Sequence, residues 1–93
     1  MTEEEINQFI IIHKIEEEIQ NSFKCLLDSN TSEELDIDSK NISITSKKIK
    51  YKLTELNHHS FQTSINKADV EIGYYALLYN DDGKRTDDFF IIY

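Results

Sequence analysis

The spacing of the apolar residues changes once along this chain, from a helical period to an alternating one, and this change constrains the fold most. Between residues 12 and 26, apolar side chains recur every three or four positions. From residue 40 onward, apolar and polar residues alternate. The first period places one apolar stripe on a helix, and the second is typical of strands that bury one face. The chain therefore predicts a helix followed by an antiparallel sheet. The stripe consists of Ile12, Ile15, Ile19, Phe23 and Leu26.

The predicted helix covers residues about 3–28 and has a length of roughly 38 Å at 1.5 Å per residue. Thr2 and Glu5 have the spacing of a capping box, in which each side chain pairs with a free backbone N–H of the other residue. Ile6 and Ile10 fall off the main stripe. Either the first turns contact a second surface, or the helix bends there.

An acidic connection, residues about 29–39, is expected to be a loop. Thr31 or Ser32 is placed to cap one short turn, whereas Leu35 and Ile37 offer the alternative of an early strand. The sheet is predicted over residues about 40–93, with turns at 46–48, 57–60, 66–69 and 80–83. The last turn is the strongest hairpin signal because Gly83 tolerates positive φ.

The predicted fold class is therefore α+β: one long N-terminal helix packed on a four- or five-stranded antiparallel meander sheet. Residues 1–93 are expected to form a single domain, because a chain of this length holds one hydrophobic core.

The final hairpin is apolar on both faces. One face carries Tyr74, Ala76 and Leu78, and the opposite face carries the residues between them. Since one helix covers only one face, the second face is expected to meet the chain's own loops if the sheet curls, a second copy, or a different protein. The residues predicted to bind a partner there are Tyr75, Leu77, Tyr79 and Phe90.

A long helix followed by a sheet that ends in this hairpin, Tyr74 to Tyr93, resembles the cystatin and nuclear-transport-factor-2 architectures in element order. This resemblance implies a curved sheet around the helix and carries over no functional residue.

The net charge of −8 is unevenly distributed. Residues 1–38 hold eleven acidic and two basic side chains, whereas residues 39–93 hold seven and eight. Such a charge argues against direct binding of nucleic acid or of anionic membranes. It favours a basic protein partner, although an acidic face also serves solubility alone. The acids predicted to contact the partner are Glu16, Glu17, Glu33, Glu34, Asp36 and Asp38.

No pattern in the chain predicts an enzyme, a cofactor or a metal site. His58 and His59 are adjacent and are expected to be turn residues, and two glycines cannot build a phosphate loop. Cys25 is the one cysteine and is expected to pack under a loop. With no disulfide and no apparent signal segment, a soluble cytoplasmic protein is predicted.

The predicted function is a small acidic protein-binding module that inhibits a basic partner enzyme. In size and charge, the chain resembles bacterial immunity proteins and phage anti-defence proteins. Two alternatives stay open. One is a pocket for a small ligand, lined by Tyr74, Tyr75, Phe89 and Phe90, and the other is a homodimeric structural subunit.

Overall fold

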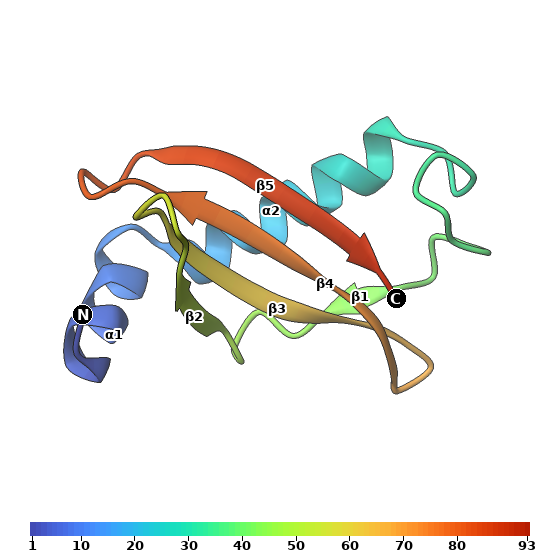
Figure 1. The fold of residues 1–93 in the computed structure, drawn as a ribbon. Helices are drawn as coiled ribbons and strands as arrows, with labels where there is room; N and C mark the ends of the chain where they lie inside the picture. The colour runs from blue at the N-terminus through green and yellow to red at the C-terminus, as the bar shows by residue number, and fades with distance from the viewer.

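In the computed structural model, which describes residues 1–93, two helices lie on one face of a five-stranded antiparallel sheet (Figure 1). This arrangement confirms the α+β class and the antiparallel sheet. The helices are α1 (Glu3–Ile12) and α2 (Ile15–Ser29), and the strands are β1 (Ser43–Ile44), β2 (Lys50–Leu53), β3 (His59–Lys67), β4 (Val70–Tyr79) and β5 (Arg85–Ile92).

The prediction of one long helix is wrong, because the chain turns between α1 and α2. Lys14 has φ 51° and ψ 47°, a left-handed conformation that a continuous helix does not contain. On one uninterrupted helix, the apolar stripes of the two segments would point roughly 130° apart. The turn at Lys14 lets both stripes face the sheet, and it leaves Ile12 exposed. Neither helix is both long enough and apolar enough to span a membrane.

Both predicted helix-start signals near Thr2 and Thr31 form capping boxes. The Thr2 hydroxyl accepts from the Glu5 N–H at 3.2 Å, and the Glu5 carboxylate accepts from the Thr2 N–H at 3.1 Å. Thr31 and Glu34 repeat the arrangement, with distances of 3.1 and 2.8 Å. The connection is thus a loop with a turn, as predicted, and it buries Leu35.

There are five strands, of which β2 to β5 follow the predicted meander order, whereas β1 pairs with β3 rather than with β2. β1 and β2 lie end to end along β3, and β4 and β5 follow on the other side of β3. A turn at residues 46–48 separates β1 from β2, at the place where the apolar positions change parity.

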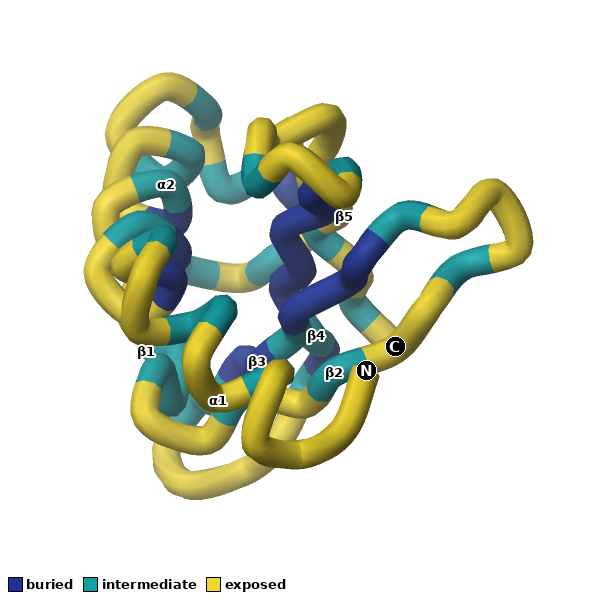
Figure 2. The backbone as a smooth tube through the Cα atoms, turned by 90° about the vertical axis from the view of Figure 1, so that its left-hand side faces the viewer, coloured by how far each residue is buried: buried dark blue, intermediate teal, exposed yellow.

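The core lies between the helices and one face of the sheet, as the buried segments of Figure 2 show. α1 contributes from one end, where the rings of Phe9 and Phe61 stack with centroids 5.3 Å apart. Burial of each large apolar side chain contributes about 1.5–3 kcal/mol, so this cluster holds the helices on the sheet. Its members are Ile15, Ile19, Phe23, Phe61, Ile65, Tyr75, Leu77 and Tyr79.

Three of the residues predicted to be exposed on the final hairpin are therefore buried. Tyr75, Leu77 and Tyr79 face α2 and belong to the core, so the expectation that they bind a partner from the surface is wrong. Phe90 is half-buried and stacks on Phe23, with ring centroids 6.3 Å apart. The helices leave the other face of the hairpin uncovered, and on it Phe89 and Ile91 of β5 are exposed whereas Ala76 and Leu78 of β4 are buried.

A β-bulge between β3 and β4 is the physical reason why Tyr75, Leu77 and Tyr79 face the helices. On the turn side of the bulge, Asn66 lies opposite Glu71, whereas beyond it Phe61 lies opposite Leu77. Without the one-residue shift, Phe61 would lie opposite Ala76. Because a slip of one residue moves every side chain of a strand to the other face, the bulge decides which face of β4 the helices cover.

Candidate functional site

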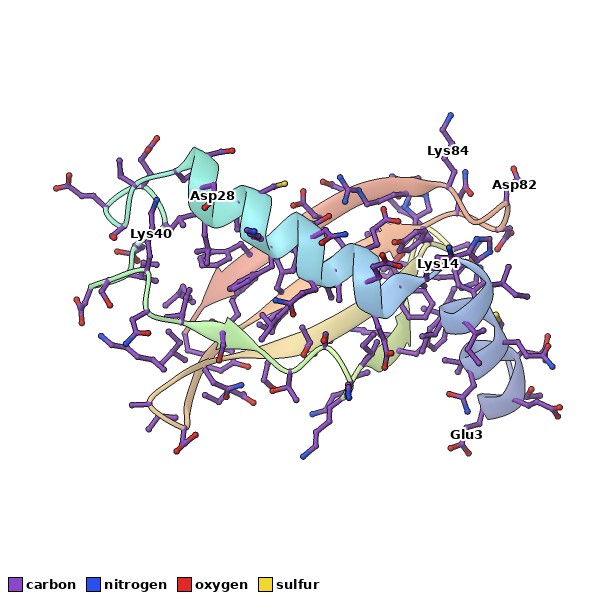
Figure 3. All side chains as sticks on the ribbon, turned by 180° about the vertical axis from the view of Figure 1, so that it is seen from behind. Glu3, Lys14, Asp28, Lys40, Asp82 and Lys84 are labelled. Carbon is purple, nitrogen blue, oxygen red and sulfur yellow. The ribbon has the colours of Figure 1, made fainter.

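A groove of about 780 Å³ lies between α2 and β5 and is open to solvent. Figure 3 shows α2 crossing the sheet beside β5, with Lys14 and Asp28 near the two ends of the helix. The residues of α2 that line the groove recur every three or four positions and therefore form one face of the helix: Glu17, Glu18, Asn21, Ser22, Cys25, Leu26 and Ser29.

Tyr75 and Asp88 form the inner wall of the groove. The Tyr75 O–H donates to a carboxylate oxygen of Asp88 at 2.9 Å. Burial raises the pKa of the Tyr75 phenol, and the hydrogen bond to the Asp88 carboxylate and the charge of that carboxylate raise it further. Tyr75 therefore stays protonated at neutral pH and holds Asp88 in place beside the groove.

Arg85 closes one end of the groove by linking β5 to α2. Its guanidinium donates to the Ser22 hydroxyl and lies 3.6 Å from a carboxylate oxygen of Glu18. A second bulge, between β4 and β5, places Arg85 opposite Tyr79 and thus on the face that α2 covers. The local register, rather than helix or strand propensity, brings these two elements together.

The lining of the groove carries a small excess of negative charge, because Glu17, Glu18 and Asp88 outnumber Lys14 and Arg85 by one. The two elements as wholes are more acidic: α2 holds four carboxylates and one lysine, and β5 holds two carboxylates and one arginine, so their combined net charge is −4. Three of these carboxylates, those of Glu16, Asp28 and Asp87, lie outside the groove lining. The last turn of α2 has no basic residue. Its free carbonyl groups add the negative end of the helix dipole, so the groove favours cationic groups.

The predicted acidic contact residues separate into three places. Glu17 lines the groove, and Glu16 and Glu17 both border a second hollow next to Lys47. The other four, Glu33, Glu34, Asp36 and Asp38, lie in the connection beyond the far end of α2.

Two acids of the connection already have partners within the chain. Asp38 lies 3.6 Å from the Lys67 ammonium. The backbone hydrogen bond from Thr31 lowers the pKa of the Glu34 carboxyl, which serves as a cap. Neither carboxylate is as free to bind a partner as Glu17.

Sequence reasoning missed Glu18, Arg85 and Asp88. Asp88 could have been found, because it has the same parity along β5 as Phe90 and therefore shares its face. Glu18 and Arg85 carry no such signal, since their pairing depends on the second bulge and on the crossing of α2 over β5.

Cys25 and His59 differ from expectation. Cys25 is exposed in the groove rather than packed under a loop. His59 is buried at the start of β3, where Nδ1 lies 2.6 Å from the Tyr51 hydroxyl and Nε2 lies 2.7 Å from a carboxylate oxygen of Asp81. These two hydrogen bonds connect the β4–β5 turn to β2. No group of three or more His, Cys, Asp or Glu side chains is placed to hold a metal ion.

No protein-family model, curated protein or solved structure matches this chain. The site itself is therefore the basis of the functional argument.

Proposed function

We propose that the protein is a binding module for a basic protein and that it inhibits a basic enzyme by covering the surface where that enzyme binds phosphate groups. The observation that carries this proposal is the number of unpaired acids. Of eighteen Asp and Glu side chains, Glu18, Asp38 and Asp81 lie within 4 Å of a side-chain nitrogen of Arg, Lys or His, which leaves fifteen without such a neighbour.

Unpaired carboxylates suit this role for two reasons. A surface of one sign attracts a partner of the opposite sign before contact and speeds association. Surfaces that bind phosphate are rich in Lys and Arg, and Arg pairs with carboxylates as well as with phosphates. Carboxylates on α2 therefore offer such an enzyme the same kind of hydrogen-bond acceptor as its substrate.

The alternative of a small-ligand pocket is disfavoured by what fills the interior. Tyr75, which was expected to line a pocket, is part of the packed core, and Phe90 packs on Phe23. The hollows of the molecule are open grooves, whereas ligand pockets enclose most of the ligand.

The proposal is tested with two charge-reversal pairs. The variant Glu16→Lys/Glu17→Lys changes the first turn of α2, and the control Glu3→Lys/Glu4→Lys makes the same charge change in the first turn of α1. The partner is captured in the native cell by cross-linking, and its affinity for each variant is measured over a range of salt. We expect a basic partner, weaker binding at high salt, and about tenfold weaker binding by the α2 variant alone.

The inhibitory role is tested by adding the chain to the purified partner and following its catalytic activity, which we expect to fall. A partner without excess positive charge contradicts the proposed surface, and so does an equal loss of affinity in the two charge-reversal variants. A tightly bound partner whose activity is unchanged contradicts inhibition.

A further inference from the structure

β5 is an edge strand with unpaired backbone groups. It pairs with β4 on one side and has no strand on the other. The Tyr93 N–H donates to the Ile72 carbonyl at 2.9 Å, so the odd-numbered residues of this part of the chain direct their backbone groups toward β4. The even-numbered ones, among them Phe90 and Ile92, direct theirs outward. An open edge of this kind accepts a further strand.

This edge is only partly protected. The outward N–H of Asp88 donates to the side chain of Asp87 at 2.8 Å, which occupies one position. Phe90 and Ile92 lie in the apolar second half of β5, where no proline, lysine or local side-chain acceptor blocks the edge. An incoming strand therefore has free backbone partners at these two residues.

The two sides of this edge differ in chemistry. On the side of α2 lies the groove, where Glu17, Glu18 and Asp88 outnumber Lys14 and Arg85 by one charge. On the opposite side, apolar side chains next to the edge are exposed: Phe89 at 45%, Ile91 at 38% and Tyr93 at 73%. Successive side chains of an added strand point alternately to these two sides.

We infer that β5 and α2 bind an extended segment of the partner, in which basic and apolar residues alternate, as an additional strand of the sheet. Its basic side chains enter the groove beneath α2, and its apolar side chains pack beside Phe89 and Ile91. The inference rests on the proposed function, because it specifies how the basic partner is held.

A second copy of the chain fits this edge less well than a basic segment. Pairing of β5 with β5 would bring α2 and β5 of one copy next to those of another. These two elements together carry a net charge of −4 in each molecule, and each molecule carries −8. Like charges that face each other across an interface oppose association, whereas a basic segment neutralises them.

The test uses a short synthetic peptide in which lysine and valine alternate. The first control peptide has the same composition with all lysines grouped at one end, and the second carries backbone N-methyl groups on alternate residues. Binding is followed by NMR titration and by amide hydrogen exchange. We expect the alternating peptide to protect the Phe90 and Ile92 amides and to bind about tenfold more tightly than either control.

A matched pair of protein variants locates the contact. Asp88→Asn removes a charge from the groove, and Asp87→Asn removes the same charge from the opposite face of the same strand. Asparagine retains an acceptor oxygen in both, so the bonds to Tyr75 and to the Asp88 N–H persist. We expect Asp88→Asn to weaken binding of the alternating peptide several-fold more than Asp87→Asn does.

The inference is overturned if the alternating peptide does not bind, or if the grouped peptide binds equally well. It is also overturned if the β5 amides stay unprotected, or if both aspartate variants lose the same affinity for the alternating peptide. These outcomes leave the proposed function to its own test, because the charge-reversal pairs measure the intact partner and require no added strand.

Discussion

Lys14 determines how the two helices are placed, and it does so in a costly backbone conformation. Its left-handed φ and ψ cost an L-residue about 1–2 kcal/mol, whereas glycine adopts them freely. We expect Lys14→Gly to raise the free energy of unfolding by about 0.5–1 kcal/mol, since the extra freedom of glycine in the unfolded chain offsets part of the gain.

Urea denaturation measures this effect, and Lys24→Gly is the control. Lys24 is exposed within α2, so glycine there should lower the free energy of unfolding by about 1 kcal/mol. Destabilisation by both substitutions would contradict the strain assigned to Lys14.

Two buried tyrosines of β4 differ in how their hydroxyls are satisfied. The Tyr79 hydroxyl is buried without a hydrogen-bond partner, whereas that of Tyr75 donates to Asp88. An unsatisfied buried polar group is costly, and a formed hydrogen bond contributes about 1 kcal/mol. We therefore expect Tyr75→Phe to lower the free energy of unfolding by about that amount, and Tyr79→Phe to leave it unchanged or raise it. A larger loss from Tyr79→Phe in thermal or urea unfolding would contradict this assignment.

The same two phenols make stability depend on alkaline pH. Burial raises the pKa of Tyr79, as it does that of Tyr75, and the nearby carboxylates of Glu18 and Asp88 add to the effect. Because the folded-state pKa of each phenol lies above the unfolded value of about 10, both phenols stabilise the folded state fully at pH values below about 10. This stabilisation is lost as the pH rises through the folded-state pKa.

We accordingly expect the free energy of unfolding to fall above about pH 10, and the slope to be smaller in the double variant Tyr75→Phe/Tyr79→Phe. Unfolding curves at a series of alkaline pH values measure the slope. An equal slope in both proteins would show that other groups cause the loss.

For single elements, local signals in the sequence were sufficient to predict where the first helix begins and where the loop and the strands lie. They did not predict the register between strands. Capping residues, alternating stretches and polar turns predict the helix start, the loop and the meander, because each depends on neighbours in the chain. The helix break was signalled by Ile6 and Ile10, whose stripe differs from that of α2. The bulge beside Asn66 has no such signal, and it reversed the expected face of β4.

Gly73 is required for the close pairing of β4 with β5. A Cβ at this position would lie 1.9 Å from the Ile91 carbonyl oxygen, so the backbone of β5 must move to admit it. We expect Gly73→Ala to lower the free energy of unfolding by about 1–3 kcal/mol and to speed amide exchange at Ile91 and Tyr93. Ala76→Gly is the control, since it weakens β4 without pushing β5 away. Unchanged exchange at Ile91 in Gly73→Ala would contradict this contact.

At the scale of the whole molecule, the candidate site joins residues that are distant in the chain. Glu17 and Glu18 come from the first turn of α2, whereas Arg85 and Asp88 come from the last strand. The sequence predicts an acidic helix and an apolar hairpin separately. Only the packing of α2 over β5, which follows from the two bulges, combines them into one groove.

The combination of a high negative charge with an open β5 edge predicts how the molecule behaves when its charge is removed. At neutral pH, the net charge of −8 opposes association of copies through the open β5 edge. Repulsion falls as the pH approaches the isoelectric point of about 4.7. We therefore expect the mass measured by light scattering to rise between pH 7 and pH 5, because open edges then pair with each other.

Two lysine substitutions separate edge pairing from a general loss of charge. Ile91→Lys places a charge beside the open edge, and Ile11→Lys makes the same change at an exposed apolar residue of α1. Lysine next to an edge strand opposes its pairing with another chain, whereas on a helix it alters only the net charge. Association near pH 5 should therefore be lost in Ile91→Lys and retained in Ile11→Lys. Equal association in the two variants would mean that copies meet elsewhere than at β5.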